Sequence, residues 1–269
     1  MSDKKTNLEV ATPKRDYVDP TASTRGGVSG VLETTLRRFK NLMHLILITP
    51  LYLLSCAMIG LAAIPGVALF EYLQVASQAQ TPVLRYFILG FGLAAGFYAY
   101  GFSMVFIVPL VNFCARANLK PWRGPYYSLE AIRWYIHNAA LYLIRYTFLE
   151  FITPSPFNIL FYKMMGMKIG AGTAINTTNI SDPSMIEMGE KVTIGGSVTI
   201  VAHYGQGGYL VLAPVKIGDK ATIGLKATIM GGVTIGAGAK VMPNSVVMPK
   251  TEIPPGETWG GVPAKPILS

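Results

Sequence analysis

The sequence has 269 residues, of which 51% are apolar and only 14% are charged, whereas about a quarter is charged in ordinary soluble proteins. This composition excludes a typical soluble globular protein and indicates that part of the chain lies in lipid. The net charge of +9 comes from basic residues clustered beside apolar runs, which favours contact with anionic lipid over nucleic acid. Cys56 and Cys114 fall in or beside those runs and are expected to be buried thiols outside any disulfide framework.

The first 35 residues are polar and basic and hold no apolar signal-peptide core. They predict a disordered basic arm.

Two uncharged runs follow, Leu42 to Phe70 and Tyr86 to Ala115, and each is long enough to cross a bilayer. They predict a transmembrane helical hairpin over residues 36–120. Basic residues flank its outer ends, so the positive-inside rule places both termini in the cytoplasm, at the inner (cytoplasmic) membrane. Gly92 and Gly96 form a G-x-x-x-G step that would allow a close helix contact, although glycine is also simply common in membrane helices.

Residues 121–166 contain apolar runs that are too short to span a bilayer. A helix is expected from Ser128, as its N-cap, to Phe151, and it ends before Pro154. Its Trp, Tyr and Arg residues are typical of a helix that lies at the membrane interface. If it crossed the bilayer instead, the rest of the chain would lie outside, away from cytoplasmic thioester donors.

The C-terminal part, residues 167–269, has a period of six. Every sixth residue is a branched aliphatic, at Ile217, Ile223, Ile229, Ile235, Val241, Val247 and Ile253. A period of six fits neither a helix nor an alternating strand, and it is the hexapeptide repeat of a parallel β-helix in which three hexads form one triangular coil. The expected fold is therefore an all-β parallel β-helix preceded by the hairpin and the interfacial helix.

The repeat is interrupted at Ala202 to Gly208, where about five extra residues bulge from a corner. This bulge carries His203, the only histidine of the repeat region. Insertions in solenoids gather on one face, commonly the binding face, and a neutral imidazole can take a proton from a hydroxyl or amine. His203 is thus the candidate general base; the alternative is an ordinary exposed loop histidine.

A second irregularity, between Ile175 and Met188, contains Asn176, Asn179 and Asp182. These side chains would bind an acceptor or orient the histidine, as a carboxylate does in a catalytic triad. They would equally suit β-helix corners, where left-handed backbone angles favour Asn and Asp. Lys226 belongs to a set of lysines that would attract the phosphates of a nucleotide donor, or would simply solvate the surface.

The stretch Ala213 to Gly224 (APVKIGDKATIG), the histidine about ten residues before it, and the closing stretch Trp259 to Lys265 (WGGVPAK) resemble the hexapeptide-repeat acyltransferases. The resemblance implies a left-handed β-helix, His203 as general base, CoA bound along the repeat, and active sites between the subunits of a homotrimer. It places Trp259, Gly260 and Ala264 near the end of the donor groove.

Residues 35–268 as a whole resemble one unit of the C-terminal membrane region of poly-ε-lysine-synthetase-like peptide synthetases, through the hairpin, Arg133 and Trp134, a Thr-Pro stretch, and the MMGMKIG run before the repeat. Those proteins carry adenylation and carrier domains ahead of three such units, and this sequence has one unit. Three copies would replace the tandem units, which implies a homotrimer. The donor thioester is then CoA or the phosphopantetheine of a carrier protein or peptide synthetase, since both present the same arm.

The sequence therefore predicts a membrane-anchored acyltransferase that moves an acyl or aminoacyl group from a pantetheine thioester to a hydroxyl or amine at the cytoplasmic membrane face. No permanent cofactor, metal or nucleic acid is expected. A zinc prism would need three histidines, and His44 and His137 lie outside the repeat. The alternative function is a non-catalytic trimeric membrane scaffold.

Overall fold

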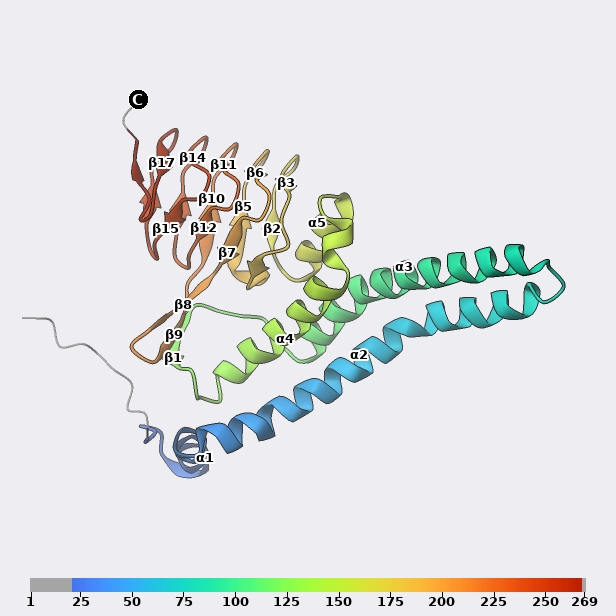
Figure 1. The fold of residues 1–269 in the computed structure, drawn as a ribbon. Helices are drawn as coiled ribbons and strands as arrows, with labels where there is room; N and C mark the ends of the chain where they lie inside the picture. The colour runs from blue at the N-terminus through green and yellow to red at the C-terminus, as the bar shows by residue number, and fades with distance from the viewer. Residues whose placement is uncertain (1–20, 268–269) are drawn as a thin grey trace, which may run out of the picture.

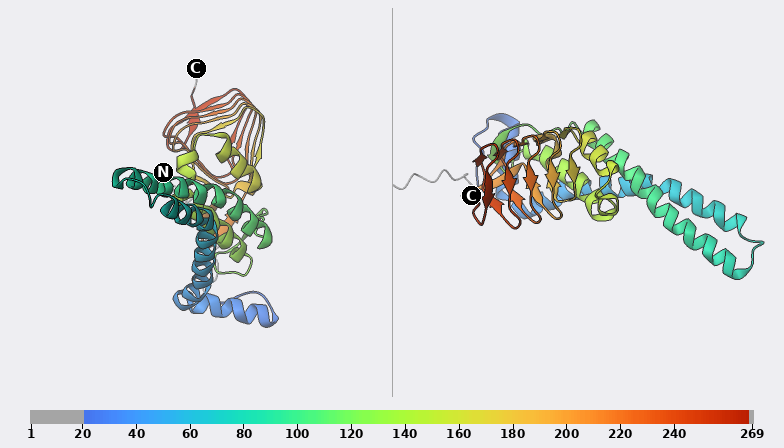
Figure 2. Two further views of the ribbon diagram at one scale, coloured as in Figure 1. Left: turned by 90° about the vertical axis from the view of Figure 1, so that its right-hand side faces the viewer. Right: turned by 90° about the horizontal axis from the view of Figure 1, so that it is seen from above.

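The computed structural model describes residues 21–267 of the chain. A long helical hairpin projects from one side, a stack of short strands forms the other, and two shorter helices lie between them (Figures 1 and 2). Most of the predicted basic arm, residues 1–20, lies outside the described residues.

The prediction of disorder up to residue 35 is wrong at its C-terminal end, because helix α1 runs from Gly27 to Arg38. Glu33 is buried on this helix and pairs with Arg37 one turn later. Arg25 reaches both Glu33 and Glu130. Of these ion pairs, only the one between Arg25 and Glu130 joins parts of the chain that are far apart in sequence.

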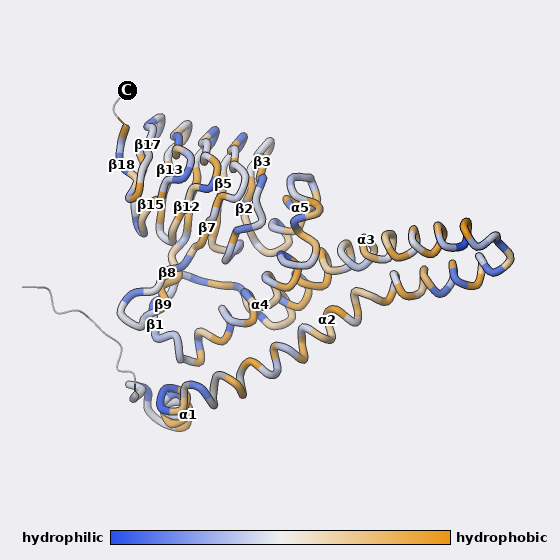
Figure 3. The backbone as a smooth tube through the Cα atoms, in the orientation of Figure 1, coloured by the Kyte–Doolittle hydropathy of each residue, from blue (hydrophilic) through white to orange (hydrophobic). Residues whose placement is uncertain are grey.

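The hairpin consists of α2 (Lys40–Ala76) and α3 (Pro82–Cys114). Both helices are long and apolar enough to cross a membrane, over Ile48–Ala76 and Pro82–Cys114, and their colouring in Figure 3 is mostly hydrophobic. Large apolar side chains such as Ile64 and Phe91 are exposed on them. Cys56 and Cys114 are free and exposed, so the expectation of burial is wrong: both point away from the helix contacts.

The two hairpin helices approach closely at a glycine pair. A Cβ added at Gly66 of α2 would lie 2.8 Å from the carbonyl oxygen of Gly96. The glycine at position 96 therefore allows the close contact that its G-x-x-x-G step suggested.

The helix predicted from Ser128 is α4 (Ala131–Thr147), and the 3-10 helix η1 (Leu149–Ile152) follows it. The Ser128 hydroxyl accepts a hydrogen bond from the Ala131 N–H, but the N-cap position of α4 is Glu130, two residues after the predicted cap. One face of α4 is buried, and its Arg145 donates to the carbonyl oxygen of Ile180 in the strand region. Helix α5 (Pro156–Met164) then leads into the repeat.

The repeat region forms three parallel sheets that the chain visits in turn. The first holds β2 (Lys168–Ile169), β5 (Ile186–Met188), β10 (Val215–Ile217), β13 (Thr234–Ile235) and β16 (Glu252–Ile253). The second holds β3 (Ala174–Ile175), β6 (Thr193–Ile194), β11 (Thr222–Ile223), β14 (Lys240–Val241) and β17 (Thr258–Gly260), with β18 (Lys265–Pro266) paired antiparallel at its end. The third holds β4 (Ile180–Ser181), β7 (Thr199–Val201), β12 (Thr228–Ile229) and β15 (Val246–Val247). We call this three-sided stack the solenoid.

The strand register matches the repeat. Ile217 lies opposite Ile235, three hexads later, and Ile223 lies opposite Val241 in the same way. These aliphatic residues are buried, and so are the small residues between them, such as Ala221 and Ala227. The period of six therefore corresponds to one strand on one face, and three such strands complete a coil. The left-handed winding stays a prediction.

A small antiparallel sheet stands beside the solenoid. It joins β1 (Trp122–Pro125), β9 (Tyr209–Leu212) and β8 (His203–Gln206) in the order β1-β9-β8. The bulge predicted around His203 is thus a hairpin, and the segment between α3 and α4 pairs with its outer strand.

Candidate active site

The loop histidine and the corner aspartate occupy neighbouring positions at one edge of the solenoid. Strand β4 pairs with β7 so that Ser181 lies opposite Val201, and the residues that follow each strand leave the sheet at the same corner. Asp182 turns this corner with a left-handed backbone, at φ 60°, a conformation that Asp tolerates better than most residues. The 3-10 helix η2 (Pro183–Met185) then leads into the next face.

His203 and Asp182 form a hydrogen-bonded pair. Nδ1 of His203 lies 2.5 Å from Oδ2 of Asp182, with the carboxylate fully buried and the imidazole 20% exposed. Nε2 of His203 makes no hydrogen bond to any part of the chain that the structure describes. The second ring nitrogen is thus left for a ligand. Asp182 is both a corner residue and a partner of the histidine, so the two interpretations of this residue hold together.

Two side chains of α4 hold the other oxygen of Asp182. Trp134 Nε1 donates to Oδ1 at 3.0 Å, and Asn138 Nδ2, one helical turn on, donates to it at 3.3 Å. The indole of Trp134 also packs edge-on against the His203 ring, with 5.0 Å between centroids. Neither residue was predicted to belong to the site; their only signal in the sequence was a Trp and an Asn four positions apart on a helix.

Asp182 stays ionised in spite of its burial. Desolvation opposes its charge, but the hydrogen bond and charge of His203, together with the hydrogen bond from the Asn138 amide, outweigh it, and the pKa of Asp182 falls below its ordinary value. An ionised carboxylate fixes the proton of a neutral imidazole on Nδ1, and Nε2 then carries the lone pair that a general base needs.

His137 links this region to the hairpin. Its Nδ1 lies 2.8 Å from Oδ1 of Asn112 on α3, and Nε2 is buried with no hydrogen-bond partner among the described residues. Burial lowers the pKa of His137 to about 4, although the charge of Asp182 acts in the opposite direction. His137 is therefore neutral at physiological pH.

The other predicted acceptor residues are not brought to the pair. Asn176 is exposed after β3, and Asn179 precedes β4. Neither amide side chain hydrogen-bonds to His203 or Asp182 in the structure as described. Both sit at corners of the coil, which fits the structural alternative for them.

The predicted donor residues lie at a different edge. Lys226 turns the corner between the second and third sheets with φ 57°. Gly260 ends strand β17 of the second sheet, and Trp259 packs partly buried against the solenoid core. The Ala264 N–H donates to the carbonyl of Val246. In one chain, the third sheet separates this edge from His203.

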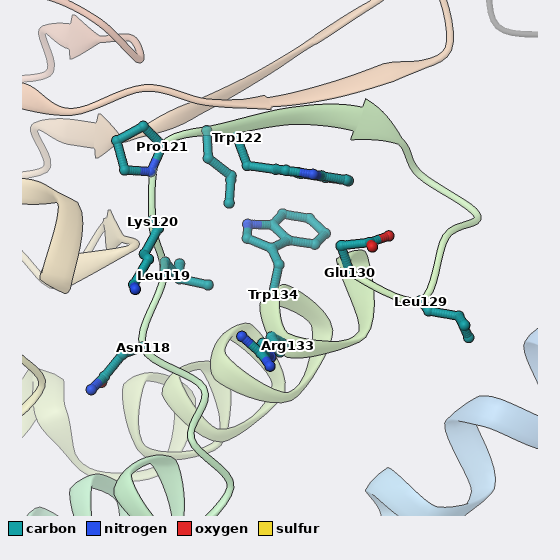
Figure 4. A pocket seen from close by; sticks show the side chains of 10 residues that line it. Asn118, Leu119, Lys120, Pro121, Trp122, Leu129, Glu130, Arg133 and Trp134 are labelled. Carbon is teal, nitrogen blue, oxygen red and sulfur yellow. The ribbon is translucent and has the colours of Figure 1, made fainter. Parts of the chain in front are cut away.

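A pocket of about 500 Å³ opens beside the histidine hairpin. Trp122 and Trp134 lie one above the other in it, with Arg133, Lys120 and Glu130 around them (Figure 4). Leu212, which is paired with His203 across the hairpin, forms another part of the wall. His203 is not itself in the lining, but two of its direct neighbours are. Within residues 21–267, no three His, Cys, Asp or Glu side chains are grouped as a metal site would require.

No family model matches the chain. Delta-poly-L-ornithine synthetase of Acinetobacter baumannii is 26% identical over 145 residues, which is 54% of this chain and 11% of that protein. The chain thus spans a small part of the length of this curated relative.

The solved structures include a hexapeptide-repeat-containing acetyltransferase of Vibrio cholerae, at 33% identity over 39% of this chain and 62% of that one, with a TM-score of 0.35. Its complex with acetyl coenzyme A matches at 34% identity over 39% of this chain and 60% of that one, also with a TM-score of 0.35. The chain is therefore similar, each time over part of its length, to a hexapeptide-repeat-containing acetyltransferase and to a poly-ornithine synthetase.

Proposed function

We propose that this protein is a membrane-anchored acyltransferase that moves an acyl or aminoacyl group from a pantetheine thioester to a hydroxyl or amine. The observation that carries the proposal is the His203–Asp182 pair: a partly exposed imidazole on a buried, ionised carboxylate at the edge of a hexapeptide-repeat solenoid. Similarity to the acetyltransferase crystallised with acetyl coenzyme A supports a thioester donor.

In the proposed reaction His203 acts as general base. Nε2 takes the proton of the acceptor while Asp182 holds the Nδ1–H and stabilises the imidazolium that forms. The acceptor oxygen or nitrogen attacks the thioester carbonyl, the C–S bond breaks, and His203 returns the proton to the departing thiolate. A backbone N–H near the corner would stabilise the oxyanion.

The separation of the His203 edge from the Lys226 edge within one chain supports an active site shared by subunits. His203 lies at one edge and Lys226 at another, with the third sheet between them. In a homotrimer the histidine edge of one subunit would face the Lys226, Trp259, Gly260 and Ala264 edge of the next, since a cyclic trimer repeats one contact between two different faces. The donor is acyl-CoA, or the phosphopantetheine arm of a carrier protein or peptide synthetase.

The hairpin anchors the enzyme in the cytoplasmic membrane, with both termini and the solenoid in the cytoplasm. The length and exposed apolar surface of α2 and α3 support the membrane anchor. The orientation rests on the basic residues at the outer ends of the hairpin, and α4 then lies at the interface. Membrane lipid surrounds the hairpin, and no nucleic acid takes part.

The test is acyl transfer in membranes. Membranes that contain the protein are incubated with labelled acyl-CoA, and lipids and small products are analysed by mass spectrometry. His203→Ala should lower turnover by about 10²- to 10⁴-fold, as expected for a lost general base, with donor binding unchanged. Full activity in this variant would remove His203 from the mechanism. Absence of any donor binding, to CoA or to a carrier protein, would favour the non-catalytic scaffold.

A further inference from the structure

A second cavity lies between the hairpin and α4. It has a volume of about 550 Å³. Its walls are mainly aliphatic and aromatic side chains of α2 and α4, namely Ile48, Leu51, Tyr52, Ala139, Tyr142 and Leu143. We call it the hairpin groove. Its α2 residues belong to the first turns of the apolar span Ile48–Ala76, which places the groove at the end of the hairpin nearest the solenoid.

The hairpin groove reaches the candidate active site through two residues. Trp134 and Asn138 both line it, and both donate hydrogen bonds to Asp182. The Trp134 ring also contacts His203. A molecule in the groove therefore lies one side chain away from the histidine.

The pocket of Figure 4, on which Trp134 also borders, is cationic. Lys120 and Arg133 are exposed in its wall and form no ion pair with any described residue. The one acid in the lining, Glu130, is paired with Arg25. Two cations are thus left without a counter-charge beside an apolar groove.

We propose that these two cavities bind the acceptor, and that the acceptor is an anionic lipid. Its acyl chains lie in the hairpin groove, its phosphate lies between Lys120 and Arg133, and a hydroxyl or amine of the head group lies at His203. Charge complementarity selects the anionic head group, and the apolar walls take up the chains. This inference rests on the proposed function, whose acceptor it specifies.

The reaction that follows is acylation of the lipid head group. The head-group O–H or N–H loses its proton to Nε2 of His203, an ester or amide bond forms to the acyl carbon, and the C–S bond of the thioester breaks. The thiolate receives the proton, so the products are an acylated anionic lipid and a free thiol. No oxidant, reductant or further reactant is needed.

The binding experiment uses the full-length protein in mild detergent with photoreactive phosphatidylglycerol, and with phosphatidylcholine bearing the same photoreactive chain. Phosphatidylglycerol should label peptides of α2 and α4 that line the groove, and should label them more strongly than phosphatidylcholine does. Ala139→Phe fills the groove and should abolish this labelling. Ala94→Phe, at an exposed alanine of α3 outside the groove, is the matched control and should leave it unchanged.

The head-group site is tested with Lys120→Gln combined with Arg133→Gln. The preference for phosphatidylglycerol should fall by about three- to tenfold, the size expected for two exposed ion pairs. Lys216→Gln combined with Lys240→Gln removes the same charge from exposed positions on the solenoid and should have no effect.

Equal labelling by both lipids, or labelling that survives Ala139→Phe, would overturn the lipid site even if the protein acylates a soluble acceptor. Selective labelling without acyl transfer from any thioester donor would leave the lipid site in place and overturn the proposed function instead.

Discussion

Asp182 and His203 are 21 positions apart in the sequence, yet they leave the solenoid at the same corner because β4 and β7 pair in register on successive coils. The pair is therefore set by the stacking of the coils, whereas the orientation of the carboxylate is set from outside the solenoid by α4. The effect of this orientation on catalysis can therefore be tested with substitutions on α4 that leave the solenoid unchanged.

Trp134→Phe should lower turnover by about tenfold, because it removes one hydrogen bond to a charged acceptor while keeping an aromatic ring beside His203. A merely structural role would not change the pH profile, so kcat is measured across pH together with donor KM. We expect the low-pH side of the kcat profile to shift and the KM for the donor to stay unchanged. The Asn138 amide donates to the same oxygen, so Asn138→Ala should combine non-additively with Trp134→Phe. An unaltered kcat at every pH would show that α4 does not position the pair.

Stability should decrease as the pH falls from about 6.5 to about 4. The folded-state pKa of His137 is lowered to about 4 from its ordinary value of 6.5, so in this window the unfolded chain binds a proton that the folded protein does not. The contribution of neutral His137 to the free energy of unfolding is complete above the pKa of the unfolded state. About 3 kcal/mol of it is lost by pH 4. Thermal unfolding in detergent at a series of pH values measures this loss of stability.

The variant that tests this pH dependence is His137→Gln, which should flatten the stability curve between those pH values. The lowered pKa of Asp182 acts below its ordinary range, near pH 4 and under, and so does not obscure the effect. A wild-type curve that is already flat would mean that His137 is not buried as a neutral side chain.

Gly66→Ala should destabilise the hairpin by about 1–3 kcal/mol, the usual cost of overpacking, because the new Cβ would meet the backbone of Gly96 at 2.8 Å. Gly60→Ala, six residues earlier on α2, has nothing within 4 Å of the new Cβ and is the matched control. Unfolding temperatures in detergent compare the two. Equal behaviour would show that the helices do not touch at this point.

Two inactive variants should restore activity when they are mixed, if the active site lies between subunits. One variant is His203→Ala, and the other combines Lys226→Asp with Ala264→Trp at the opposite edge. In randomly mixed trimers about a quarter of the interfaces would carry an intact histidine edge beside an intact donor edge. Co-expressed variants should then reach about a quarter of wild-type activity. No recovery, or a fully active monomer by native mass spectrometry, would place the whole site in one chain.

The solenoid was predictable because its pattern repeats at every hexad, so that Ile217 and Ile235 face the same core for the same local reason. His203 was found as the interruption of that pattern. Trp134 was not assigned to the site because its contact with Asp182 joins positions 48 residues apart and depends on how α4 docks on the solenoid. Strand β1 was missed because Gly124 and Pro125 are poor strand residues, and the strand forms only against the edge of β9.

The pairing of β1 with β9 also limits how the protein can be divided for study. A fragment that begins at the solenoid would lack β1, and β9 would expose a row of unpaired N–H and C=O groups right next to the histidine hairpin. Such open edges recruit strands from other molecules. A soluble fragment without the membrane helices would therefore tend to self-associate at the hairpin that carries His203, and the assembly state of such a fragment would not report that of the intact protein.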